Sequence, residues 1–153
     1  MRKPNDILLP EVRKMVSEGH TVTLKVRGNS MRPFLHDGRD KAILTACHEA
    51  KVGEVVLAEI TPGHYVLHRV KRVEGSNVTL LGDGNLNPEH CQQADIRAKA
   101  VAFYRKKHTK PDSTSGKKWR YYSWWWTRLT PIRRYLLFLC NPHVPRRFFK
   151  RAS

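Results

Sequence analysis

A serine stands at the end of a strand-like segment, in a setting that suits nucleophilic chemistry. Residues 26–35 read VRGNSMRPFL, so Ser30 follows a Gly-Asn pair, and Pro33 then fixes the chain direction. A serine at a sharp turn after a strand is exposed, and neighbouring backbone N–H groups can point at an oxyanion. Serine is also a common turn residue with no chemical role. These residues alone leave both interpretations open.

A histidine further along the chain could supply the base that this serine needs. His68 lies in a strand-like stretch, and a neutral imidazole with a pKa of about 6.5 can take a proton from a hydroxyl near pH 7. Lys71 is three residues away, which places it on the opposite face of a strand. The alternative is a histidine that only contributes to the strand. His68 is therefore the candidate base.

An acidic side chain would orient the imidazole and stabilise its protonated form. Asp83 is the first candidate, although the sequence Asp-Gly-Asn at 83–85 is also a good turn in its own right. We expect Asp83 to orient His68.

Four short motifs, in order along the chain, resemble those of serine peptidases of the signal peptidase I and LexA type. They are GNSMRP at 28–33, GEVVL at 53–57, HRV at 68–70 and GDGN at 82–85. The first resembles the nucleophile box of the whole group. The last two resemble boxes of the archaeal and endoplasmic-reticulum signal peptidases, which use histidine where bacterial enzymes use lysine. The resemblance spans roughly residues 22–104. It also implies a second acidic position after the GDGN box, for which this chain offers Glu89 and, further on, Asp95.

This resemblance implies a serine endopeptidase that cleaves a peptide or precursor protein with Ser30, His68 and Asp83. It places the oxyanion and substrate contacts at Gly28, Asn29 and Met31, and it implies no cofactor and no metal. An extended substrate would lie along a strand edge, and small side chains are expected just before the scissile bond.

Two other functions remain open. One is a LexA-like regulator that processes itself or its partner, for which a DNA-binding helix-turn-helix is expected before the peptidase domain. The other is a catalytically inactive β domain that binds peptides or membranes. Cleavage that depends on the serine and the histidine separates these alternatives.

The hydrophobic pattern predicts a mostly β fold. Apolar residues spaced as in a helix precede Gly19, and alternation at period two begins near residue 21. Further strands are expected at 41–44, 55–60, 65–73, 78–81 and 96–104, separated by turn sequences. The resemblance implies the coiled mixed β-sheets of the LexA and signal-peptidase domains. We divide the chain into an N-terminal helix at 1–19, a serine peptidase β domain at 20–106, a linker at 107–118 and a basic aromatic tail with helical character at 119–153.

The tail carries much of the chain's positive charge, which is +16 in total. Residues 1–106 hold 17 basic and 12 acidic side chains, whereas residues 107–153 hold 12 basic and one acidic. Aromatic residues cluster in the same segment, at 119–126. This composition fits an anionic membrane surface, packing against the β domain, or nucleic acid. We favour the membrane surface.

Cysteine usage and hydropathy bear on location. Cys47, Cys91 and Cys140 have no zinc-ligand spacing and fit a reduced, intracellular setting. The sequence contains no run of about 18 apolar residues, the length expected of a membrane-spanning helix. The first residues do not resemble a secretory signal. We therefore expect a cytoplasmic protein, held on the membrane periphery by its tail.

Overall fold

The protein is described by a computed structural model that covers residues 4–106 and 109–140. The helices are α1 (Pro4–Ser17), α2 (Lys117–Arg128) and α3 (Arg133–Cys140), with short 3₁₀ turns at Gln93–Asp95 and Thr130–Ile132. The strands are β1 (Val22–Lys25), β2 (Lys41–Thr45), β3 (Val55–Thr61), β4 (His64–Glu74), β5 (Asn77–Leu81), β6 (Glu89–Gln92), β7 (Ile96–Tyr104) and β8 (Asp112–Ser113).

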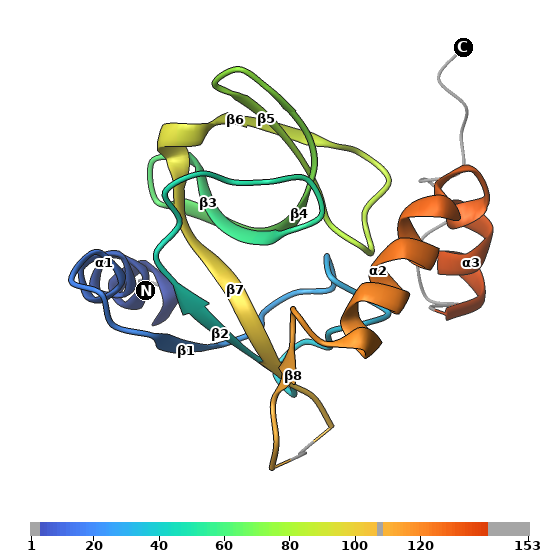
Figure 1. The fold of residues 1–153 in the computed structure, drawn as a ribbon, viewed down its shortest axis with the longest axis horizontal. Helices are drawn as coiled ribbons and strands as arrows, with labels where there is room; N and C mark the ends of the chain where they lie inside the picture. The colour runs from blue at the N-terminus through green and yellow to red at the C-terminus, as the bar shows by residue number, and fades with distance from the viewer. Residues whose placement is uncertain (1–3, 107–108, 141–153) are drawn as a thin grey trace.

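The strands form one sheet in the order β1-β2-β7-β3-β4-β5-β6, with β8 added beside β7. All the pairings among the described strands are antiparallel. The register shifts in β2, β3 and β4, and such irregularities bend and twist strands. As a result, β3 to β6 curl around one another, while β1, β2 and β7 extend away from them (Figure 1).

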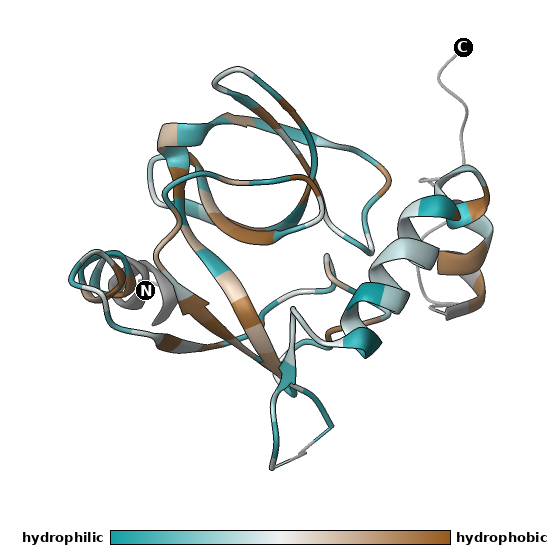
Figure 2. Cartoon of the chain, viewed as in Figure 1, coloured by the Kyte–Doolittle hydropathy of each residue, from teal (hydrophilic) through white to brown (hydrophobic). Residues whose placement is uncertain are grey.

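Two hydrophobic cores result from this coiling. The larger core joins α1, the segment after β1, the strands β2 and β7, and α2, with Phe103, Met31 and Leu35 almost fully buried. The smaller core fills the curl of β3 to β6 around Val56 and Leu80. Figure 2 shows the corresponding hydrophobic stretches in β2, β3 and β7. The long strand β4 connects the two cores.

The predicted mostly β fold, with a short N-terminal helix and a helical C-terminal appendage, is confirmed. The six predicted strands correspond to β1, β2, β3, β4, β5 and β7. The strands β6 and β8 were not predicted because both are very short and neither alternates between apolar and polar residues. The segment expected to be a linker contains β8 and the start of α2.

The C-terminal helices pack against the sheet. Trp119 and Trp126 of α2 are buried, and Trp119 lies edge-on to Phe34 with ring centroids 4.6 Å apart. Phe103 of β7 packs on the same indole at 4.8 Å. Packing against the β domain is thus one role of the aromatic segment. Over the described residues, the helices are too short or too polar to cross a bilayer.

Candidate active site

Ser30 lies in the segment that leaves β1, and the residues that follow it anchor this segment. Met31 and Leu35 are buried in the larger core, so they fix the backbone on the far side of Ser30. Gly28 has a φ of +81°, a conformation that favours glycine, and its N–H donates to Asp37 Oδ1 at 2.9 Å. Ser30 itself is half-buried.

The predicted oxyanion and substrate residues differ in exposure. Gly28 and Asn29 are exposed beside Ser30, whereas the Met31 side chain is only 1% exposed and belongs to the core. Met31 can therefore serve the site through its backbone and by anchoring Ser30, but its side chain is not open to a substrate.

The turn at 82–85 packs directly against the serine segment. Gly84 N–H donates to the Ser30 carbonyl at 2.7 Å. A Cβ atom on Gly82 would lie 2.4 Å from the same Ser30 oxygen, and one on Gly84 would lie 2.4 Å from the Asn29 oxygen. Only glycine permits so close an approach of two backbones. Two of the four motifs are thus in contact.

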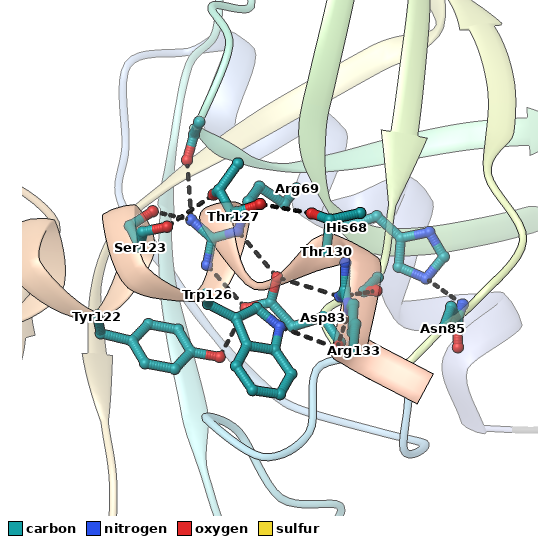
Figure 3. A network of polar contacts seen from close by, with 12 residues as sticks. His68, Arg69, Asp83, Asn85, Tyr122, Ser123, Trp126, Thr127, Thr130 and Arg133 are labelled. Carbon is teal, nitrogen blue, oxygen red and sulfur yellow. Dashed lines mark hydrogen bonds and ion pairs between the residues drawn. The ribbon is translucent and has the colours of Figure 1, made fainter. Parts of the chain in front are cut away.

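His68 projects from β4 beside this turn. Its side chain is buried, and its backbone pairs with Val56 of β3. The Asn85 amide nitrogen lies 3.5 Å from His68 Nε2, and Figure 3 shows the ring directed at Asn85 and away from the Arg69 guanidinium. This divergence follows from the alternation of side chains along a strand. The turn at 82–85 therefore contacts both Ser30 and His68.

Glu89, at the start of β6, lies at the other nitrogen of the imidazole. Its Oε2 is 3.1 Å from His68 Nδ1, which is ion-pair distance, although the two groups are not aligned for a good hydrogen bond. Both atoms are buried, and neither hydrogen-bonds elsewhere within residues 4–106 and 109–140. A carboxylate facing Nδ1 favours the tautomer with its proton there, which leaves Nε2 as the acceptor.

Burial lowers the pKa of His68 below its ordinary value, and the charges of Glu89 and Asp83 oppose this shift in part. The imidazole is therefore neutral at pH 7. A neutral imidazole with a free acceptor nitrogen is the form that a general base requires.

Asp83 has different partners from those expected. Both of its carboxylate oxygens accept from Arg69, from Nε at 2.8 Å and from Nη2 at 2.7 Å, and the Tyr122 hydroxyl donates to Oδ2 at 3.1 Å. None of the contacts found among the described residues joins Asp83 to the imidazole. These contacts lend no support to the prediction that Asp83 orients His68, because its carboxylate faces the buried Arg69, whereas Glu89 is the acid that lies against the ring.

Asp95, the third acidic candidate, is also occupied elsewhere. Its Oδ2 accepts from the Gln92 backbone N–H at 2.8 Å, at the start of the 3₁₀ turn before β7. This contact gives Asp95 a local structural role.

Arg69 follows His68 in the HRV motif, and the sequence alone assigned it no role. Besides Asp83, its guanidinium donates to the Gly53 carbonyl at 3.1 Å and to the Ser123 hydroxyl, and it stacks 4.7 Å from the centre of the Trp119 ring. A buried cation is stable only when it is paired and hydrogen-bonded, and these contacts meet that need. Arg69 thereby connects the turn at 82–85 to α2.

Two cysteine thiols and the residue types that could bind a metal ion are also described by the structure. Burial raises the pKa of the Cys47 thiol, and it raises that of Cys91 to about 11, so both are protonated at pH 7 and weakly nucleophilic. Cys140 lies in α3, but its side chain is outside the described part of the structure. In that part, no group of three or more His, Cys, Asp and Glu side chains is arranged to hold a metal ion.

Comparison with protein families matches residues 4–103 to the family described as Peptidase S24-like. The chain belongs to this family, whose LexA-like fold and serine-peptidase character agree with the coiled sheet and with the contacts between the serine segment and the turn at 82–85. The family implies a peptide or protein substrate. The match ends before α2, so the C-terminal helices lie outside it. Among curated proteins no significant match was found.

Proposed function

We propose that the protein is a serine endopeptidase of the signal-peptidase type, with Ser30 as nucleophile, His68 as general base and Glu89 as the residue that orients His68. The observation that carries the proposal is the shared turn at 82–85. It bonds the Ser30 carbonyl and lies against His68 Nε2, while Glu89 occupies the Nδ1 side. One turn that contacts both the Ser30 backbone and the Nε2 side of His68 supports their assignment to a common site.

In the proposed reaction, Ser30 Oγ bonds to the substrate carbonyl carbon as its proton passes to His68 Nε2. The C–N bond of the tetrahedral intermediate then breaks, and His68 returns the proton to the leaving amine. Water repeats the sequence on the acyl-enzyme and releases the acid. The Asn85 amide lies 3.5 Å from Nε2, at the long limit of a hydrogen bond, so this weak contact holds the ring and is exchanged for the serine hydroxyl when the proton is transferred. The backbone N–H groups of Ser30 and Asn29 are the proposed donors to the oxyanion, because the Gly28 N–H already donates to Asp37.

The test is cleavage of quenched fluorescent peptides that carry small side chains before the scissile bond. Ser30→Ala and His68→Ala are expected to lower kcat/KM by a factor of 10³ or more. Ser76→Ala and His48→Ala are matched controls, since both positions are exposed and remote from the site, and they should retain wild-type rates. Undiminished cleavage by Ser30→Ala would contradict the mechanism.

The same assay separates the two alternatives. A LexA-like self-processing protein would lose a fragment of its own chain in a Ser30-dependent way and leave added peptides intact. An inactive binding module would bind peptides without cleaving them. Either outcome would overturn the endopeptidase assignment.

For the partner of the tail, we propose an anionic membrane surface on the cytoplasmic side. Three aromatic side chains project from α2 with large exposed fractions: 68% for Tyr121, 53% for Trp124 and 43% for Trp125. Exposed basic residues stand on the same helix at 117, 118, 120 and 128. Interfacial aromatics beside cationic side chains suit the boundary between headgroups and acyl chains. The predicted tail extends to residue 153, and its last part, residues 141–153, lies outside the described residues.

Sedimentation with lipid vesicles tests this attachment. Binding to phosphatidylcholine vesicles that contain phosphatidylserine, an anionic lipid of the cytoplasmic leaflet, should weaken at least tenfold when Trp124 and Trp125 are both changed to Ser. Met15→Ser, an exposed apolar position on α1, is the control and should bind as the wild type does. Equal binding by the double variant, or displacement of the protein by RNA at physiological salt, would contradict the proposal.

A further inference from the structure

The C-terminal helices hold the turn at 82–85 by its backbone. The Trp126 indole N–H donates to the Asp83 carbonyl at 3.1 Å, and Arg133 Nε donates to the same oxygen at 3.0 Å. Arg133 Nη2 donates to the Gly82 carbonyl at 2.6 Å. Figure 3 shows Trp126 and Arg133 converging on Asp83 from the helices. Two consecutive carbonyls of this turn are thus bound by side chains of α2 and α3.

These contacts are buried and specific. Trp126 is 8% exposed and Arg133 5%, and the Arg133 guanidinium lies 5.5 Å from the Trp126 ring centre. Arg133 Nη2 also lies 3.8 Å from Asp83 Oδ1, so the same carboxylate balances two buried guanidinium groups, Arg69 and Arg133. An arginine is normally solvated, and its burial here requires the partners that the turn provides.

The held segment continues directly into the contacts of the proposed catalytic residues. One residue after Asp83, Gly84 N–H donates to the Ser30 carbonyl, and the next residue, Asn85, lies at His68 Nε2. A shift of the two bound carbonyls would therefore move groups that touch both Ser30 and His68. The helices that make these contacts lie beyond residues 4–103, the part that matches the family.

We propose that Trp126 and Arg133 are positioning residues for the peptidase site, so that the C-terminal helices are part of the catalytic unit. This inference rests on the proposed function. The two side chains fix the carbonyls of Gly82 and Asp83, and the turn in turn fixes Ser30 and His68. Neither of them touches the substrate or the reacting atoms.

The kinetic test uses conservative variants of the full chain. Trp126→Phe removes the indole donor and keeps an aromatic ring, and Arg133→Met removes both guanidinium donors. Each should lower kcat about tenfold with KM changed less than about twofold, as expected for loss of one or two buried hydrogen bonds that act on geometry. Arg133→Lys, which keeps the charge and one donor, should recover part of the loss. Trp124→Phe and Arg120→Met, at exposed positions on α2, should have no effect.

A second readout does not depend on activity. In a Ser30→Ala background, amide hydrogen exchange of Gly84 should be about tenfold faster in Trp126→Phe than in Trp124→Phe, because the bond from Gly84 to residue 30 is loosened. Exchange at Leu80, in the smaller core, should stay the same and thereby exclude general unfolding. The NMR titration of His68 should shift in the same variant.

The outcomes of the two readouts can be told apart. If the wild type cleaves no peptide, the proposed function fails while the exchange measurement still tests the coupling. If Trp126→Phe and Arg133→Met leave both the Gly84 exchange and the His68 titration as in the control variants, the positioning role is overturned. A kcat unchanged in both variants would overturn it as well.

Discussion

Replacement of Glu89 by Gln distinguishes the role of Glu89 from that of Asp83, the other acid near His68. Glutamine keeps nearly the same shape and removes the charge that faces Nδ1 at 3.1 Å. We expect the substitution to leave the fold intact, because Glu89 lies on a short strand at the end of the sheet and its side chain is 35% exposed. The lost interaction is the stabilisation of the imidazolium that forms as Ser30 attacks.

The size of the effect follows from the distance and the exposure. Two unit charges 3.1 Å apart interact by roughly 5 kcal/mol at an effective dielectric constant of about 20. Solvent reaches a third of the Glu89 side chain and the alignment is imperfect, so screening reduces this to about 1.5–3 kcal/mol. The expected loss in kcat/KM is therefore roughly 10- to 100-fold.

The pH dependence of kcat/KM gives an independent test, because the direction in which its acid limb moves can be predicted. The acid limb of kcat/KM reports the pKa of the free base, and for the wild type it should lie below about 6.5 because burial dominates. Removal of the Glu89 charge removes an interaction that raises this pKa, so the limb of Glu89→Gln should move to still lower pH. Glu74→Gln, at an exposed position on the same strand as His68, is the control. A kcat/KM within twofold of wild type, or a limb displaced to higher pH, would refute the role of Glu89.

Three further predictions concern stability and backbone contact. Asp83→Asn should lower the free energy of unfolding by about 3–5 kcal/mol, because Arg69 and Arg133 lose their buried counter-charge. Urea denaturation measures this loss, and a value below about 1 kcal/mol would contradict the prediction. The depressed pKa of His68 means that the unfolded chain binds a proton more readily, so this group's contribution is complete above about pH 6.5 and declines as the pH falls. Wild type should therefore lose more stability between pH 7.5 and 5 than His68→Asn does, and equal losses would argue against a buried neutral imidazole. Gly82→Ala should reduce kcat/KM at least tenfold, since the added Cβ would stand 2.4 Å from the Ser30 oxygen; an unimpaired enzyme would show that the turn moves freely.

Local sequence signals predicted the larger elements of the fold. Alternation at period two marks strands such as β1 and β7, and the turn and motif chemistry marks Ser30 and His68 as candidates. The acid that lies against the His68 ring could not be identified in this way. Asp83 and Glu89 both follow the histidine, and only the register of β5 with β6 brings Glu89 rather than Asp83 to the ring.

The contacts of the C-terminal helices were beyond sequence reasoning for a related reason. Trp126 and Arg133 lie 43 and 50 residues from Asp83 along the chain, and nothing in their local pattern distinguishes them from exposed neighbours such as Trp124. The strongest available signal was the density of aromatic and basic residues, which fits packing and membrane contact equally well. Tertiary packing decides which side of α2 is buried.

Identification of the residue that carries the acyl group tests the central claim most directly. The protein would be mixed with an activated peptide ester, quenched in acid, digested and analysed by mass spectrometry. We predict an acyl adduct on Ser30 in the wild type, its absence in Ser30→Ala, and a much slower appearance in His68→Ala. Turnover with the adduct on a different residue, or turnover that persists in Ser30→Ala, would contradict the account.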